Sequence, residues 1–345
     1  MIQKIVKRAR RLWRQTSLGR IKKIDNPIRW GVIGLGYMAE TFSSAIDDNK
    51  EGIVYAVASR SLDKAKVFAS RHGECKAYGS YEEMVHDKNL KLDVVYVATP
   101  VKYHYENVKL CLEAGLNVLC EKPITSTLAQ FDELIALAKK NNCFFMEGMW
   151  MKCLPSFQKA CQWINEGKIG EIEWVKADFY KRERIQEGFA IYNAQEGGGI
   201  LRDFGVYAIA FMEHFLGGIP DRLNGLFRIS SRGIDVDWQI TAEKNGVNAT
   251  INLSSNFGSM SKAAVIGKNG FIEWDSQFNR TNRVALYDTN GVQLEVFSAS
   301  YVNEGFEYEV NEVQKSIREG KKESPIVSLK GSRSTMQIID KLRKA

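Results

Sequence analysis

Two side chains that could exchange protons with a substrate, Asp203 and Tyr207, stand four residues apart in the run GGGILRDFGVYAIAFMEHFLGG. The apolar residues between the glycine groups predict one helix, so the two side chains share a face about one turn apart. Lys122 supplies a cation in the tripeptide EKP, directly after an apolar strand. We hypothesise that the three converge in one cleft. In the structural alternative, Tyr207 is a core aromatic residue and Asp203 is an acid near the start of the helix, where the helix dipole stabilises it.

The roles follow from the chemistry of these groups. A free tyrosine titrates at about 10 and is a poor base at neutral pH, but a nearby cation favours phenolate. We therefore expect Lys122 to lower the pKa of Tyr207, and we assign Tyr207 as general acid/base. Lys122 is its electrostatic partner, and Asp203 orients Lys122 or a substrate hydroxyl.

A dinucleotide fingerprint precedes these residues. It is the G-x-G-x-x-A sequence formed by Gly34, Leu35, Gly36, Tyr37, Met38 and Ala39. It lies between an apolar strand and a helical pattern, where the glycines allow a tight turn and the approach of a pyrophosphate. The helix N-terminus then offers free N–H groups to phosphates.

The residues after the second strand indicate which cofactor binds. An NAD site would place an acid there, whereas this chain has Ser59 and Arg60, with Lys64 one turn later. Arginine can hold a 2′-phosphate through two hydrogen bonds, so we predict NADP(H) in preference to NAD(H). An Arg60 that only stacks on adenine would allow both cofactors.

Residues 26–147 alternate near-continuous apolar strands with amphipathic helices. This pattern predicts an α/β fold, a Rossmann-type doubly wound parallel sheet that binds ligand at the carboxyl ends of its strands. The residues expected at those ends, beside the cofactor, are Thr99, Pro100, His104, Glu121 and Lys122.

The pattern changes in residues 148–328, which carry short alternating segments. The Asn-Gly pairs at 245–246, 269–270 and 290–291 predict hairpin turns. We expect a C-terminal α+β domain for the substrate, with an open, mainly antiparallel sheet. One face of that sheet needs cover, which favours a homo-oligomer, a dimer or alternatively a tetramer. Residues 329–345 are expected to form a helix that returns to the first domain.

Composition limits the class of protein. The chain has 345 residues, 44% hydrophobic and 26% charged, which is typical of globular proteins. The formal net charge of the chain is +7, and residues 1–25 alone carry +8. The rest of the chain therefore has a net charge of −1, so we expect no nucleic acid partner. No apolar stretch is long enough to span a membrane, and the N-terminus lacks the apolar core of a signal peptide. We therefore expect a cytoplasmic protein with six reduced cysteines and no metal site.

The basic segment 1–25 is set apart from the body. Apolar residues recur in it at helical spacing between arginines and lysines, which is typical of an amphipathic helix on an anionic membrane surface. The alternatives are a helix docked on protein and a frayed arm. We therefore keep peripheral membrane contact as one interpretation of this segment.

Together these motifs resemble the Gfo/Idh/MocA oxidoreductases over about residues 29–340. The matching sequences are GVIGLGYMA, VVYVATPVKYH, EAGLNVLCEKPIT, EGMWMKCLPSF and GGGILRDFGVY. The resemblance implies a nicotinamide-dependent enzyme acting on a sugar, sugar nucleotide, polyol or related diol, with Lys122 at the active site. Many members have histidine where this chain has Tyr207, which resembles the dihydrodiol dehydrogenase, glucose–fructose oxidoreductase and sugar ketoreductase branches. EGMWMK implies that Trp150 borders the substrate.

The function expected is an NADP(H)-dependent oxidoreductase of a carbohydrate-like substrate. Two alternatives are an oxidoreductase of trans-dihydrodiols or dicarbonyls, and a non-catalytic NADPH-binding regulatory protein. The presence of Lys122, Asp203 and Tyr207 together argues against the regulator, because a sensor needs no acid/base group.

Overall fold

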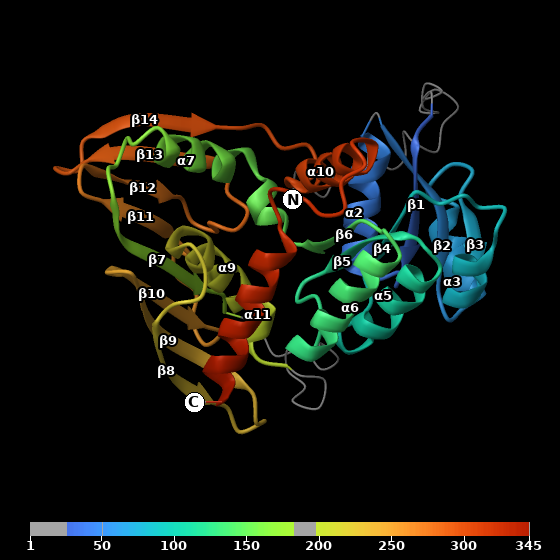
Figure 1. Ribbon diagram of the computed structural model, residues 1–345, viewed down its shortest axis with the longest axis horizontal. Helices are drawn as coiled ribbons and strands as arrows, with labels where there is room; N and C mark the ends of the chain where they lie inside the picture. Colours follow the sequence, from blue (N-terminus) through green and yellow to red (C-terminus); the bar gives the residue numbers. More distant parts are fainter. Residues whose placement is uncertain (1–25, 50, 183–197, 345) are drawn as a thin grey trace.

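The computed structural model describes residues 26–49, 51–182 and 198–344. The basic segment 1–25, with its predicted helix and membrane contact, lies outside the described residues. The described chain forms two sheets with helices between and around them (Figure 1).

The first sheet has six parallel strands in the order β3-β2-β1-β4-β5-β6. This is the doubly wound topology predicted for the first domain, with the strand order changing direction between β1 and β4. The strands are β1 (Ile28–Ile33), β2 (Gly52–Ala58), β3 (Lys76–Tyr78), β4 (Val94–Val97), β5 (Asn117–Glu121) and β6 (Phe145–Gly148).

Helices cover both faces of this sheet, because its strands are apolar on both sides. They are α2 (Tyr37–Asp48), α3 (Leu62–Ala69), α4 (Tyr81–His86), the 3-10 turn η2 (Val101–Tyr103), α5 (His104–Glu113) and α6 (Leu128–Lys140). Alternate strand residues enter two separate apolar cores. One core holds Phe131 and Leu134 of α6, and the other holds Phe42 of α2 and continues into the second domain.

The second sheet has eight strands in the order β14-β13-β12-β11-β7-β10-β9-β8, with β7 and β10 its one parallel pair among the described strands. The prediction of a mainly antiparallel sheet is therefore confirmed. The strands are β7 (Ile172–Tyr180), β8 (Arg222–Ile229), β9 (Asp235–Lys244), β10 (Val247–Ser254), β11 (Ala263–Gly267), β12 (Gly270–Trp274), β13 (Arg283–Asp288) and β14 (Gln293–Ser298).

The three predicted Asn-Gly turns join neighbouring antiparallel strands: β9 to β10, β11 to β12 and β13 to β14. Only at Asn245-Gly246 do both residues have positive φ, 51° and 84°. In the other two turns the glycine alone takes that conformation, so these turns need glycine more than asparagine.

The remaining helices are η3 (Trp150–Cys153), α7 (Pro155–Asn165), α8 (Ile200–Asp203), α9 (Gly205–Leu216), α10 (Phe306–Arg318) and α11 (Leu329–Lys344). α9 is apolar almost all round and lies buried between β7 and β10 on one side and α11 on the other.

The prediction of one continuous helix through residues 200–216 is wrong. The chain breaks at Phe204, whose φ of −112° departs from helical geometry and separates α8 from α9. The residue after the break packs closely on the second sheet, since a Cβ on Gly205 would stand 2.7 Å from Leu253 of β10. Asp203 and Tyr207 therefore belong to different helices.

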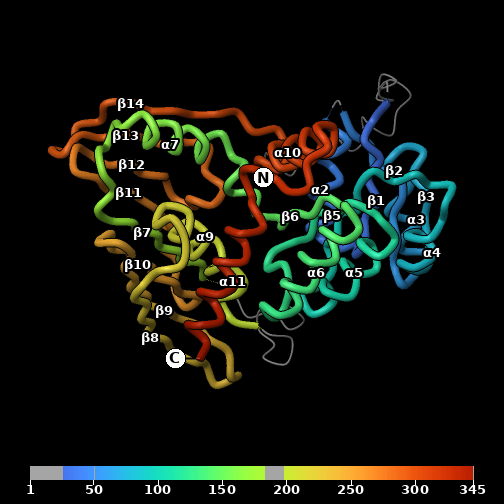
Figure 2. Tube along the Cα trace, viewed as in Figure 1, coloured from blue at the N-terminus to red at the C-terminus, as the bar shows by residue number. Residues whose placement is uncertain are grey.

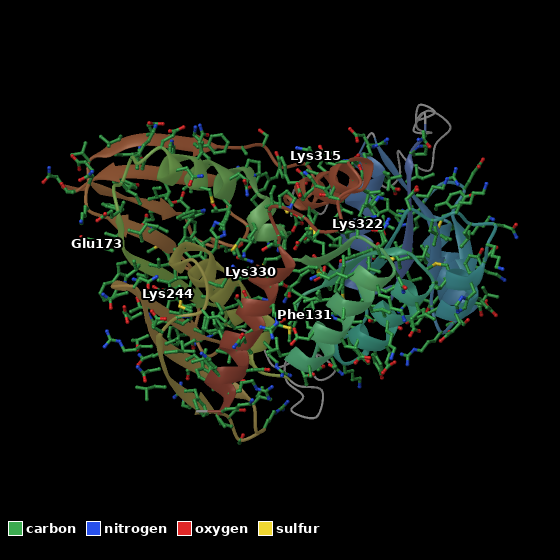
Figure 3. All side chains as sticks on the ribbon, viewed as in Figure 1. Phe131, Glu173, Lys244, Lys315, Lys322 and Lys330 are labelled. Carbon is green, nitrogen blue, oxygen red and sulfur yellow. The ribbon has the colours of Figure 1, made fainter. Side chains whose placement is uncertain are left out.

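The last two helices connect the two halves of the molecule. α10 packs against α2, and α11 passes between α6 and α9 toward β8, as the trace in Figure 2 shows. Phe131 on α6 and Lys330 at the start of α11, labelled in Figure 3, lie at this boundary. These contacts hold the first sheet and the second sheet around one cleft.

The face of the second sheet that α7 and α9 leave open carries a row of apolar side chains. Trp174, Ile266, Phe271 and Tyr287 are directly paired across four adjacent strands, and the last two rings stack 4.8 Å apart. Trp174 and Ile266 are 39% and 37% exposed. The homo-oligomer expected from such a face stays a prediction.

No helix among the described residues is long and apolar enough to cross a membrane. The six cysteines are all free thiols, four of them buried.

Candidate active site

The EKP lysine is held at the carboxyl edge of the parallel sheet. β5 ends at Glu121, and Lys122 follows at once, with a cis peptide bond to Pro123. Its ammonium group donates hydrogen bonds to the main-chain oxygen of Asp203 at 2.6 Å and to its Oδ1 at 3.2 Å. The lysine thus ties the first domain to the end of α8.

Tyr207 lies beside this lysine, although it enters from α9. The Nζ atom of Lys122 is 5.1 Å from the centre of the tyrosine ring. Trp150 donates from Nε1 to the phenolic oxygen at 3.0 Å, and its own ring stacks on Phe306 with centroids 4.2 Å apart. Because the indole uses a lone pair of the phenol, the O–H proton remains available for another acceptor.

The electrostatics agree with a charged lysine and a neutral phenol. Burial opposes charge on Lys122, but the carboxylates of Asp203 and Glu121 together with Tyr207 raise its pKa above the ordinary value. Burial raises the pKa of Tyr207 to about 12, and Lys122 opposes this only in part. The expectation that Lys122 would bring the pKa of Tyr207 below its ordinary value is therefore wrong here, because desolvation outweighs the cation.

Glu121 faces inward behind the lysine. Its Oε1 accepts from the hydroxyl of Tyr96 at 2.5 Å, and its Oε2 accepts from the backbone N–H of Lys122 at 3.2 Å. Burial raises the pKa of this carboxyl, which Tyr96 and Lys122 partly offset. The contacts fit a residue that fixes the start of the EKP turn. Sequence reasoning missed Tyr96, which reads as an ordinary strand residue.

The imidazole of His104 contacts the loops that follow β4 and β5. Its Nε2 lies 2.6 Å from the main-chain oxygen of Thr99 and its Nδ1 lies 3.0 Å from that of Pro123. Burial lowers its pKa. Asn107, which no motif in the sequence marks, donates to the hydroxyl of Thr99 at 3.1 Å. His104 therefore connects the segments that follow β4 and β5, and Asn107 supports the first of them.

The fingerprint turn fits a dinucleotide pyrophosphate. Gly34 has φ of +87°, and a Cβ there would stand 2.6 Å from the backbone nitrogen of Thr99. A Cβ on Gly36 would meet nothing within 4 Å, so the backbone of this turn faces open space at the N-terminus of α2. Tyr37 and Met38 reach the cleft, whereas the side chains of Leu35 and Ala39 are buried in the core.

The residues predicted to select the cofactor lie at the end of β2, away from the walls of the main cleft. The Arg60 guanidinium lies 5.8 Å from the ring centre of Tyr103, and both Arg60 and Lys64 are exposed. Ser59 is buried, and its hydroxyl accepts from the N–H of Ser61 at 3.3 Å. This arrangement places a cation and an aromatic ring beside each other at the end of β2.

One cleft of about 510 Å³ brings most of the predicted residues together. The first domain supplies Thr99, Pro100, His104, Glu121 and Lys122 to its walls, and the second domain supplies Trp150, Asp203 and Tyr207. The predicted residues that do not line this cleft are Gly34, Leu35, Gly36, Ala39, Ser59, Arg60 and Lys64.

Other cleft residues were missed by sequence reasoning. Phe179 at the end of β7 and Phe306 at the start of α10 add an aromatic lining, and Asn279 adds an amide. No local motif marks them, because they come together only when three distant segments pack. The position of Phe179 next to the carboxyl end of a strand was the one signal available.

Comparisons with known proteins agree with this geometry. Residues 28–149 match the family model described as "Oxidoreductase family, NAD-binding Rossmann fold", and residues 157–273 match the Gfo/Idh/MocA C-terminal domain. The trans-1,2-dihydrobenzene-1,2-diol dehydrogenases of Mus musculus and Homo sapiens are 32% and 31% identical to this chain. Each alignment covers 92% of this chain and 96% of the relative.

Among solved structures, KijD10, a 3-ketoreductase from Actinomadura kijaniata in complex with NADP and TDP-benzene, is 27% identical. It matches with a TM-score of 0.80 over 92% of this chain and 98% of its own. An NAD binding oxidoreductase from Klebsiella pneumoniae shares the fold, with 20% identity and a TM-score of 0.82 over 93% of this chain and 96% of its own. The resemblance seen in the motifs is confirmed. The chain belongs to the Gfo/Idh/MocA family and is an NAD(P)-dependent dehydrogenase or reductase.

Proposed function

We propose that this enzyme uses NADP(H) to interconvert a carbinol and a carbonyl on a sugar, sugar nucleotide or polyol. Tyr207 is the general acid/base, and Lys122 is its electrostatic partner. The observation that carries the proposal is the meeting of Lys122, Asp203 and Tyr207 in one cleft, at the end of β5 and next to the fingerprint turn.

The cofactor site is argued from the residues present. The open backbone at Gly36 and the N-terminal N–H groups of α2 suit a pyrophosphate, and Arg60 suits a 2′-phosphate. When bound, the nicotinamide supplies or accepts the hydride. The protein's own groups manage the proton and the charge on the substrate oxygen.

Tyr207 is suited to donating a proton to a substrate carbonyl oxygen. It is neutral at physiological pH, since its pKa is raised to about 12. The phenolate left after donation faces the Lys122 ammonium and the Trp150 N–H, which both stabilise negative charge on that oxygen. In the reverse direction the same phenolate accepts the proton of the carbinol.

Asp203 completes the arrangement by holding the lysine. Its Oδ1 and main-chain oxygen accept two of the three ammonium protons of Lys122. The third proton is then available to a substrate oxygen beside Tyr207. Asp203 is 45% exposed at its side chain, so it can also accept from a substrate hydroxyl.

The test is a panel assay of NADPH oxidation with the full-length protein. Ketoses, keto-sugar nucleotides and dicarbonyls serve as oxidised substrates, and NADH replaces NADPH in a parallel set. We expect turnover of carbohydrate-like ketones and a lower KM for NADPH than for NADH. Turnover of dicarbonyls alone, or equal KM values for the two cofactors, would require a different proposal.

A second candidate is the oxidation of trans-dihydrodiols. The relatives at 31–32% identity carry that activity in their names. Trp150, Phe179 and Phe306 also give the cleft aromatic surfaces that suit a flat apolar ring. Assay of trans-1,2-dihydrobenzene-1,2-diol with NADP⁺ compares the two candidates directly.

A further inference from the structure

A polar segment of the second domain forms part of the cleft wall. It connects β12 to β13, and its residues Gln277, Asn279 and Arg280 line the cleft together with Lys122 and Tyr207. Arg280 pairs with Glu304, another cleft residue, at 3.1 Å. The proposed transfer of hydride and proton assigns no role to the residues of this segment.

Asn279 is unusual within it. The residue is 6% exposed, and its side-chain oxygen has no hydrogen-bond partner among the described residues. A buried acceptor without a donor loses its hydration and gains nothing in return. Such groups are rare in folded proteins, and each one needs an explanation. Because Asn279 lines a cavity, a ligand donor is the explanation that the geometry offers.

The segment is firmly held, so the unpaired oxygen does not come from a loose loop. The N–H of Phe278 donates to the main-chain oxygen of Ser261 at 3.0 Å, and the N–H of Arg280 donates to that of Gln277 at 2.8 Å. The Phe278 ring is 1% exposed and packs edge-on against Phe179 with centroids 5.8 Å apart. These contacts fix the backbone on both sides of Asn279.

Backbone strain occurs in the same wall. Gln277 and Glu304 have φ of 62° and 61°, a left-handed conformation that non-glycine residues adopt at a cost. Conformations of this kind persist where the surrounding contacts over-determine them, and they cluster at ligand sites. The wall is therefore pre-organised around Asn279.

We propose that Asn279 is a specificity-determining residue whose side-chain oxygen accepts a hydrogen bond from a substrate hydroxyl other than the one that reacts. The inference rests on the proposed function and narrows it to polyhydroxylated substrates. The aromatic residues Trp150, Phe179 and Phe306 can contact the apolar face of a pyranose or of an aromatic diol equally well. The pyranose brings hydroxyl donors on several carbons, whereas the diol brings one, on the carbon next to the reacting one, so the donor assigned to Asn279 is a hydroxyl further from the reacting carbon.

Loss of this hydrogen bond should lower activity toward the sugar more than activity toward the aromatic diol. A site built to bond a substrate hydroxyl discriminates against an analogue that lacks it, because the buried acceptor is then left unpaired. Asn279→Leu keeps the approximate size of the side chain and removes the acceptor. It should lower the ratio of kcat/KM for a sugar to kcat/KM for an aromatic diol by about tenfold, the loss of one buried hydrogen bond.

The experiment uses the full-length enzyme with NADP⁺ and two probes. One is the best substrate from an aldohexose panel, tested with its monodeoxy derivatives, and the other is trans-1,2-dihydrobenzene-1,2-diol. The inference predicts the fall in the ratio for Asn279→Leu, and one deoxy sugar that is penalised in the wild type but not in the variant. An unchanged ratio would overturn it.

The control is Asn282→Leu. Asn282 lies three residues further on, is exposed, does not line the cleft and donates to the main-chain oxygen of Ala299 at 2.7 Å. It should leave the ratio of the two kcat/KM values unchanged. A similar fall in both variants would mean that the loop is merely disturbed.

Thermal unfolding without ligand gives a second readout that does not depend on turnover. Replacing an unpaired buried acceptor by an apolar group should leave the Tm of Asn279→Leu at or above that of the wild type. A Tm lowered by several degrees would assign Asn279 a structural role and overturn the inference. If the wild type oxidises neither probe, the proposed function fails, while the Tm still decides for or against Asn279 as a ligand residue.

Discussion

The indole N–H of Trp150, in η3, donates a hydrogen bond of 3.0 Å to the phenolic oxygen of Tyr207, in α9. This hydrogen bond favours the phenolate and lowers the pKa of Tyr207 against the larger effect of burial. Trp150 is therefore a positioning residue for the acid/base group, in addition to its place in the cleft wall.

Trp150→Phe should impair oxidation and reduction alike. The variant keeps an aromatic ring to stack on Phe306 but leaves the Tyr207 phenolate without one donor. That phenolate is the base in oxidation and the product of proton donation in reduction, so both rates should fall about tenfold. Steady-state rates in both directions check this, with Trp163→Phe as the control because its indole binds Glu295 outside the cleft. A loss of the same size in Trp163→Phe would point to a packing defect.

The raised pKa of Tyr207 predicts different pH profiles for the two directions. A general acid with a pKa of about 12 stays protonated throughout, so kcat/KM for reduction should be flat between about pH 6 and 9. A base with that pKa is scarcely ionised at neutral pH, so kcat/KM for oxidation should rise by about tenfold per pH unit over the same range. An oxidation profile that levels near neutrality would show that the cation overcomes burial in the working enzyme.

Lys122→Met should lower turnover without unfolding the protein. The substitution removes the cation that faces the phenolate, and loss of such a group costs about 10²–10³-fold in kcat. The Asp203 side chain left behind is 45% exposed and remains hydrated, but the hydrogen bond to its main-chain oxygen is also lost, so the Tm should fall by only about a few degrees. Lys109→Met, which removes the surface ion pair between α5 and Glu133 of α6, is the control for loss of a salt bridge. A marked fall in Tm for Lys122→Met would make the lysine a structural residue first.

Arg60→Ala should raise the KM for NADPH at least about tenfold and change the KM for NADH little, because a charged hydrogen bond to the 2′-phosphate is lost. Lys66→Ala, an exposed lysine on α3, the helix that follows Arg60, should change neither value. Equal increases for both cofactors would assign Arg60 to stacking on adenine, the alternative left open by the sequence.

The sequence predicted the first domain well because its signals are local. Apolar strands, the fingerprint glycines and Gly115 after α5 each follow from the chain within a few residues. The three Asn-Gly turns of the second sheet were found for the same reason. The break at Phe204 was not found, since no local pattern marks it, and the neighbouring close approach of Gly205 to Leu253 joins segments that are remote in sequence.

In the candidate site too, the residues with local signals could be predicted and those that depend on long-range packing could not. Lys122 and Tyr207 could be paired from motif and chemistry, but the direction of the pKa shift of Tyr207 could not be predicted. It depends on how deeply the fold buries the ring, which no local pattern reports. The hydrogen bonds from Trp150 to Tyr207 and from Tyr96 to Glu121, and the unpaired oxygen of Asn279, likewise appear only after distant elements pack together.

The central claim is that Tyr207 transfers the proton while the cofactor transfers the hydride. Single-turnover kinetics of Tyr207→Phe with bound NADPH and the best ketone substrate test it most directly, alongside NADPH affinity by fluorescence titration. Tyr308→Phe, a partly exposed tyrosine on α10 outside the cleft, is the control. We predict a hydride-transfer rate lowered by about 10²–10⁴-fold with NADPH affinity retained. A Tyr207→Phe enzyme that transfers hydride at the wild-type rate would contradict the account.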